Sequence, residues 1–124
     1  MIYHLINKEK WNKVKSKVYY RPKSVDREGY IHCSYDDQLL KVAESFHRGE
    51  EGLLVLCINE QFLGDMLRSE DLFNLNEKYP HVYGELPIKS IEKVVPLEVN
   101  ESGDFIKPNL ESISTLVVEQ GEWT

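Results

Sequence analysis

The sequence lacks the features that would place a protein in a membrane or in a disulfide framework. Its longest apolar run, residues 53–58, is too short to cross a bilayer, and the first residues do not resemble a secretory signal. Only two cysteines, Cys33 and Cys57, occur in 124 residues, and two cannot build a disulfide framework. Both lie in apolar strand patterns, so we expect buried, reduced thiols in a cytoplasmic protein without membrane contact.

Basic residues are too few for a nucleic-acid-binding protein. The chain has 15 Lys and Arg against 21 Asp and Glu, a net charge of −6. An acidic protein cannot supply the many phosphate contacts on which nucleic-acid affinity depends, so we expect no such partner. Residues 8–27 are an exception with a charge of +6. This stretch either faces water or attracts one small anionic ligand, with Arg21 as a candidate contact.

Apolar periodicity predicts one domain of short strands and helices over residues 1–124. The expected strands cover residues 1–6, 30–33, 53–58, 81–83 and 91–99. Expected helices cover residues 8–18 and 61–68. Between them the apolar set Leu39, Val42, Ala43 and Phe46 predicts another helix, with Ser34 or Asp36 as its N-cap and Gly49 as its stop. A turn at residues 86–87, a hairpin turn at 101–104 and a helix-leaning tail at 109–118 complete the chain. This order predicts an α+β domain with a mixed, strongly bent sheet, the core in residues 2–97 and a C-terminal hairpin and tail in 98–124.

Three of the four histidines lie beside tyrosines on expected strands. The pairs are Tyr3–His4, Tyr30–His32 and His81–Tyr83. Histidine titrates near neutral pH, and its ring and that of tyrosine can stack on a flat heterocycle. If the strands are neighbours, the rings would line one cleft. The alternative is that each ring is half-buried and bonded to nearby backbone without further function.

Other chemistry has weaker support in the sequence. No H-x-x-x-H or C-x-x-C spacing is present, so we expect no metal. Strand alternation places Cys33 on the face opposite to His32, where burial raises a thiol pKa and lowers its reactivity. Ser34 shares the face of His32, but helix capping is favoured over a nucleophilic role. The helix start at Ser34 could bind an anion, although Asp36 already complements its dipole.

The same motifs make the chain resemble the domain of unknown function 952, a small bacterial and plant family. The resemblance rests on residues 3–5 (Tyr-His-Leu), 28–34 (Glu-Gly-Tyr-Ile-His-Cys-Ser) and 80–86 (Pro-His-Val-Tyr-Gly-Glu-Leu), with Gln38, Val42, Ala43 and Phe46. It covers roughly residues 2–97 of the sequence.

The resemblance implies a fold similar to that of ADP-ribosyltransferases, a split, bent sheet with flanking helices around a nicotinamide dinucleotide cleft. By that similarity His4 would contact the ribose, and Tyr30, His32 and Ser34 would lie near the nicotinamide. Glu85 would be the acid that stabilises an oxocarbenium ion.

Three functions are therefore expected in order of preference. The first is binding of a small NAD-like or ADP-ribose-like ligand, with His4, Tyr30, Ser34, Tyr83 and Arg21 as contacts. The second is a transferase or hydrolase that cleaves an N-glycosidic or phosphate ester bond, with His32 and His81 as general acid and base and Glu85 facing positive charge. The third is a protein-interaction module that docks through the C-terminal block around Phe105 and Trp123.

Overall fold

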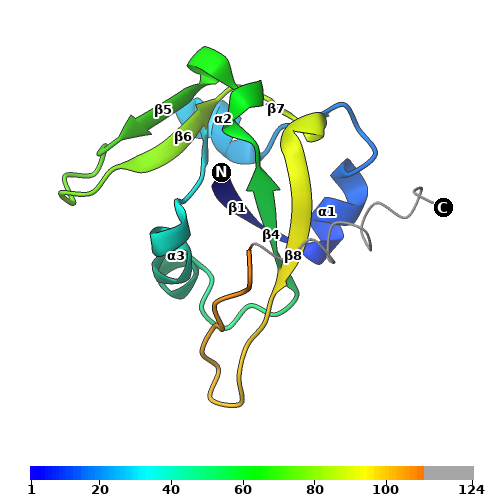
Figure 1. The fold of residues 1–124 in the computed structure, drawn as a ribbon, viewed down its shortest axis with the longest axis vertical. Coiled ribbons are helices and arrows are strands. Elements are labelled where there is room, and N and C mark those ends of the chain that lie inside the picture. Colours follow the sequence, from blue (N-terminus) through cyan, green and yellow to red (C-terminus); the bar gives the residue numbers. More distant parts are fainter. Residues whose placement is uncertain (111–124) are drawn as a thin grey trace.

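A three-stranded antiparallel sheet forms the centre of the protein. The computed structural model describes residues 1–110 (Figure 1). The strands of this sheet lie in the order β1 (Ile2–Asn7), β4 (Leu53–Ile58), β8 (Ile91–Leu97). Every residue of β4 is buried, as expected for an uninterrupted apolar strand with a neighbour on each side. The predicted central strand is therefore confirmed.

A second three-stranded sheet stands beside the first. It has the order β3 (Tyr30–His32), β6 (Tyr79–Tyr83), β5 (Leu67–Glu70). A backbone bridge between Tyr3 and Ser34 joins β1 to the end of β3, with N–O distances of 2.7 and 2.9 Å. A short pair, β2 (Tyr19–Tyr20) with β7 (Leu86–Pro87), completes the sheets. Figure 1 shows the β5–β6 hairpin projecting from the body of the molecule.

All strand pairs of residues 1–110 are antiparallel. The predicted α+β class is confirmed, but the prediction of a mixed sheet is wrong. A mixed sheet needs at least one pair of neighbouring strands that run in the same direction. In this chain every pair of neighbouring strands in the described residues runs in opposite directions. The expected similarity to the ADP-ribosyltransferase fold stays a prediction.

Short helices cover the sheets. The α-helices are α1 (Lys8–Val14), α2 (Lys23–Glu28) and α3 (Leu39–Phe46). Single 3-10 turns are η1 (Asp36–Gln38), η2 (Glu60–Phe62), η3 (Gly64–Met66) and η4 (Ile88–Ser90). Helix α3 confirms the predicted helix, although it begins at Leu39 and not directly after Ser34 or Asp36. Phe46 is 75% exposed and does not belong to its buried stripe.

The central sheet separates two apolar cores because side chains alternate along its strands. One core contains Ile2 and Ile6 of β1 and receives α1, α2 and the inner face of the second sheet. The other contains Tyr3 and Leu5 and receives α3 together with Phe105. Burial of Phe105 contradicts its predicted place on a docking surface, and Trp123 lies outside the described residues.

Several local predictions are wrong. The expected helix over 61–68 is interrupted because Gly64 adopts a left-handed conformation (φ 52°), and Leu67 then begins β5 by pairing with Val82. Helix α1 ends at Val14 instead of Val18. Helix α2 was not expected, although Pro22 before it and left-handed Gly29 after it are typical helix boundaries.

The hairpin turn predicted at residues 101–104 is confirmed, because a backbone bridge joins Val99 and Phe105 on its two sides. The N-cap of α3 is Gln38 instead of the predicted Ser34 or Asp36, and its side chain caps the preceding turn η1, where its oxygen accepts the Tyr35 N–H (3.0 Å). Most of the tail predicted as a helix, residues 111–118, lies outside the described residues.

Candidate functional site

Four aromatic rings from two strands meet on one face of the second sheet. Tyr30 pairs with Tyr83 and His32 pairs with His81 across β3 and β6. Directly opposed residues share a face of the sheet and alternate residues return to it, so all four side chains project together. Their partner pair, Ile31 and Val82, points into the core. We call Tyr30, His32, His81 and Tyr83 the ring cluster.

Tyr30 is the central ring of the cluster. Its centroid lies 4.4 Å from that of His81, 4.9 Å from His32 and 5.3 Å from Tyr83. The two imidazoles lie 5.9 Å apart in an edge-on arrangement. Residues fifty positions apart in the sequence are thus brought into mutual contact.

Each histidine of the cluster is paired with a glutamate. Nε2 of His32 donates to the carboxylate of Glu28 (3.0 and 3.2 Å), and Nδ1 of His81 donates to Oε1 of Glu70 (3.1 Å). The Tyr83 hydroxyl donates to the same Glu70 oxygen at 2.6 Å. Hydrogen bonding by His32 lowers the pKa of Glu28, and hydrogen bonding by Tyr83 and then His81 lowers that of Glu70. Both acids therefore remain ionised at neutral pH.

The cluster has an accessible layer above a buried one. The His32 side chain is 46% exposed, whereas that of His81 is 2% exposed and Tyr30 is also buried. Burial, and then the nearby Glu28 carboxylate, raise the pKa of Tyr30 to about 12. A ligand can reach His32 and half-buried Tyr83 directly. His81 and Tyr30 support them from below.

His4 lies outside the ring cluster, and both of its ring nitrogens are occupied. Nδ1–H donates to the His32 carbonyl oxygen (2.7 Å), so Nε2 accepts from the Tyr20 hydroxyl (3.0 Å). Burial lowers the pKa of His4 to about 4. His4 is consequently a neutral link between β1, β2 and β3, with no ring nitrogen left for the predicted ribose contact.

The remaining candidate residues lie apart from the cluster. Ser34 is 2% exposed and contributes its backbone to the bridge with β1. The Arg21 guanidinium donates to Asp26 at 2.6 Å, which raises the pKa of Arg21. Glu85 is exposed and contacts neither histidine of the cluster, although its charge lies near Arg21.

Sequence reasoning did not find Glu28, Glu70 or Arg68. Glu28 precedes His32 by four residues inside the quoted motif, so this spacing was a usable signal. Arg68 and Glu70 lie on β5. The sequence predicted Arg68 as the end of a helix and placed Glu70 in no element, and no sequence signal connected either residue to His81. Their approach depends on the pairing of β5 with β6.

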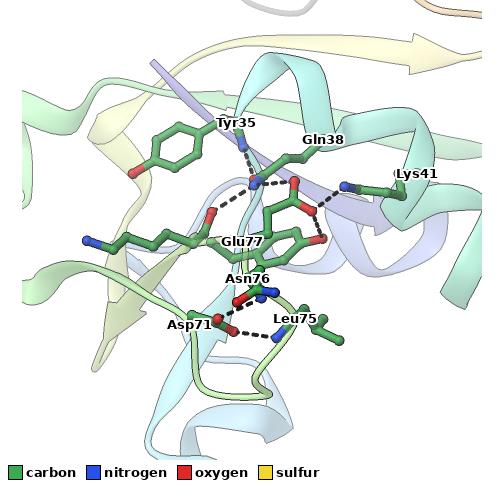
Figure 2. A network of polar contacts seen from close by, with 9 residues as sticks. Tyr35, Gln38, Lys41, Asp71, Leu75, Asn76 and Glu77 are labelled. Atoms are coloured by element: carbon green, nitrogen blue, oxygen red, sulfur yellow. Dashed lines mark hydrogen bonds and ion pairs between the residues drawn. The ribbon is translucent and has the colours of Figure 1, made fainter.

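A polar network fastens the tip of the β5–β6 hairpin to the start of α3 (Figure 2). Buried Gln38 donates to the Glu77 carboxylate (3.0 Å) and to the Lys78 carbonyl oxygen (2.7 Å). Lys41 forms an ion pair with Glu77. Within the loop, Asp71 accepts the backbone N–H groups of residues 75 and 76, both at 2.9 Å. These bonds restrain the hairpin that carries Glu70 and His81.

Neither hollow described in the structure includes a residue of the ring cluster. One, of about 620 Å³, is lined by residues including Trp11, Leu53 and Pro96. The other, of about 510 Å³, is lined by residues including Tyr19 and Phe62. The expected shared cleft is neither of these hollows, and the rings instead form a stacked surface with an accessible edge.

The described residues, 1–110, contain neither a metal-binding group of side chains nor a helix suited to span a membrane. No group of three or more His, Cys, Asp or Glu side chains is arranged to hold a metal ion in this range. None of its helices combines the length and apolar character that a membrane span requires. Cys33 and Cys57 are buried free thiols, as the sequence predicted.

Together these observations define an α+β domain in which two antiparallel sheets share a core and one carries paired histidines and tyrosines on its outer face. The family model described as "Protein of unknown function (DUF952)" matches residues 5–94, and the chain belongs to this family. A search of the curated proteins found no match.

Solved structures of CC0527 from Caulobacter crescentus share the fold. Its X-ray structure has a TM-score of 0.76 and 23% identity, covering 85% of this chain and 92% of CC0527. Its solution NMR structure gives a TM-score of 0.73 and 25% identity over 83% of this chain and 89% of CC0527. The comparisons therefore establish family and fold, and the function has to be argued from the site.

Proposed function

We propose that this domain binds a small nucleotide-like ligand, of the NAD or ADP-ribose kind, on the accessible side of the ring cluster. The observation that carries the proposal is the layered contact of four rings, with exposed His32 and half-buried Tyr83 above Tyr30 and His81. A purine or nicotinamide ring could stack on this surface, and each base stacked on an aromatic side chain contributes about 1–3 kcal/mol.

The carboxylates of Glu28 and Glu70 prepare the surface to form hydrogen bonds with the polar groups of such a ligand. Glu70 uses one oxygen for His81 and Tyr83, which leaves its other oxygen for a ribose hydroxyl. Glu28 holds the His32 ring by Nε2–H, which leaves Nδ1 as a hydrogen-bond acceptor for the ligand. The buried layer restricts ring movement, so little ordering accompanies binding.

Calorimetric titration with NAD, ADP-ribose and AMP tests this proposal, followed by the same titrations of Tyr83→Leu. Loss of one stacking ring should weaken binding by about fivefold or more. Tyr19→Leu is the matched control, because Tyr19 is an exposed tyrosine of β2 that lies outside the cluster. No heat of binding with any of the three compounds, and no movement of the histidine resonances, would exclude the proposal. If Tyr19→Leu weakens binding more than Tyr83→Leu does, the ligand binds in the hollow beside β2 and not at the ring cluster.

A second candidate function, cleavage of the N-glycosidic bond of such a ligand, is favoured by the pairing of an accessible imidazole with a carboxylate. A water molecule would attack the ribose carbon as the nicotinamide leaves, and His32 would accept a proton of that water, because its side chain is exposed and Glu28 fixes its tautomer. Glu70, kept ionised by its two donors, would face the positive charge that develops on the ribose.

NAD consumption by purified variants tests this second function. His32→Ala and Glu70→Gln should each reduce the rate at least a hundredfold. Glu85→Gln is the comparison, since Glu85 is the acid that the family resemblance suggested. If Glu85→Gln abolishes turnover and Glu70→Gln does not, the assignment of Glu70 is wrong.

A further inference from the structure

Arg68 extends the ring cluster across the third strand of the sheet. It lies directly opposite His81 on the β5–β6 pair, and His81 lies opposite His32 on the β6–β3 pair. Opposed residues share a face, so Arg68, His81 and His32 form one row of nitrogen-bearing side chains across three strands. The Arg68 guanidinium lies over the Tyr83 ring, 4.6 Å from its centroid.

The stacked guanidinium has an unused hydrogen-bonding capacity. In the part of the chain that the structure describes, Arg68 is exposed and forms no ion pair. Arg27 likewise forms no ion pair among the described residues, but it lies on α2 and not beside the rings, whereas Arg21 donates to Asp26 and Arg48 pairs with Glu44 and Asp104. Stacking uses the flat face of a guanidinium and leaves its N–H groups free in the plane, where they can grip an anion by two bonds.

The charge of Glu70 opposes anion binding at this place but does not outweigh it. Glu70 follows Arg68 by two residues on the same face, and its Oε1 already accepts bonds from His81 and Tyr83. A carboxylate beyond ion-pair distance and next to water weakens the affinity for an anion by about fivefold. Two charge-assisted hydrogen bonds strengthen it by roughly tenfold to a hundredfold. The balance favours the anion.

We infer that Arg68 binds a phosphate group of the ligand, so that the substrate class of the ring cluster is a nucleoside phosphate and not a free nucleoside or base. This inference rests on the proposed function, because the ligand ring stacks on the cluster while its phosphate reaches Arg68. It assigns phosphate recognition to β5 instead of the basic stretch at residues 8–27, where Arg21 is engaged by Asp26.

Matched ligand pairs that differ only in the phosphate test the inference. AMP is compared with adenosine, and nicotinamide mononucleotide with nicotinamide riboside, by calorimetry on the full chain. The wild type should bind the phosphorylated member of at least one pair roughly tenfold to a hundredfold more tightly. Arg68→Gln should reduce that preference to about fivefold or less, and Arg68→Lys should retain part of it because it keeps the charge without the planar fork.

Arg48→Gln is the control, because Arg48 lies at the end of α3 and pairs with acids away from the cluster. It should leave the phosphate preference unchanged. Equal binding of both members of each pair by the wild type would overturn the role of Arg68 and leave nucleotide-like binding at the cluster intact. If Arg68→Gln keeps the full preference for the phosphorylated ligand, the role of Arg68 is likewise overturned while nucleotide-like binding at the cluster stands. Absence of binding by all four compounds would overturn this inference together with the proposed function.

Discussion

The burial of His4 should make the stability of the protein depend on pH in a defined window. His4 donates to the His32 carbonyl and accepts from Tyr20, an arrangement that requires a neutral ring. Burial lowers its pKa from the ordinary 6.5 to about 4. Between these two values the unfolded chain binds a proton at His4 that the folded protein does not bind. Unfolding is therefore favoured as the pH falls.

The size of the effect follows from this difference in pKa. One pKa unit corresponds to about 1.4 kcal/mol, so the full loss of stability between about pH 7 and pH 4 approaches 3 kcal/mol. By about pH 5 the His4 contribution should already be reduced by roughly 2 kcal/mol. The acids with lowered pKa values, such as Glu28 and Glu70, lose their contribution mainly below about pH 4.5, so the two windows separate.

The assay compares urea unfolding of the wild type and of His4→Asn at several values between about pH 7 and pH 5. Asparagine keeps a donor for the His32 carbonyl but does not titrate. Subtracting the pH dependence of the unfolding free energy of the variant from that of the wild type removes the contributions of the other histidines. We expect the wild type to lose roughly 2 kcal/mol more than the variant over this range. His47→Asn is the control: His47 pairs with Glu50, and its charge is only a minor cause of the lowered pKa of His4, so the substitution should change the difference only slightly.

Parallel loss of stability in wild type and His4→Asn would refute the neutral buried state of His4. If the variant does not fold, NMR of the wild type gives the same test. The His4 ring should retain a neutral nitrogen pattern at about pH 5, one unit above its folded pKa. A ring that becomes protonated above about pH 6 would contradict the reasoning equally.

Three further predictions concern stability and reactivity. Gln38→Leu should lower the free energy of unfolding by about 1–3 kcal/mol in urea denaturation, because it removes the bonds to Glu77 and the Lys78 carbonyl and leaves the part-buried Tyr35 N–H unpaired; an unchanged midpoint would contradict this. Leu56→Ala, at a fully buried position of β4, should cost about 2–5 kcal/mol in the same assay, and a loss below about 1 kcal/mol would show that the core can close around the cavity. Native Cys33 and Cys57 should not react with a thiol reagent near pH 7, since burial raises the pKa of both, that of Cys57 to about 11; rapid modification without urea would contradict it.

The elements that the sequence predicted well are those whose signal is local. The apolar run of β4 and the periodicity of α3 depend on neighbouring residues only, and both elements occur, β4 with the predicted bounds and α3 as a shorter helix than its predicted caps imply. Period-two alternation likewise gave the two faces of β1, with Ile2 in one core and Tyr3 in the other. The predicted helix over 61–68 failed because pairing of Leu67 with Val82 outweighs the weak helical periodicity of that segment.

For the candidate site, the sequence by itself determined which rings carry titratable or stacking groups and that Tyr30 shares a strand face with His32. Only the tertiary structure decided that β3 pairs with β6, which brings His81 to His32, and that His4 is turned away into a separate link. It also decided that Glu70 reaches His81 from a strand eleven residues earlier in the chain. The physical reason is that strand register is set by long-range packing of the inner faces, which a local residue pattern does not encode.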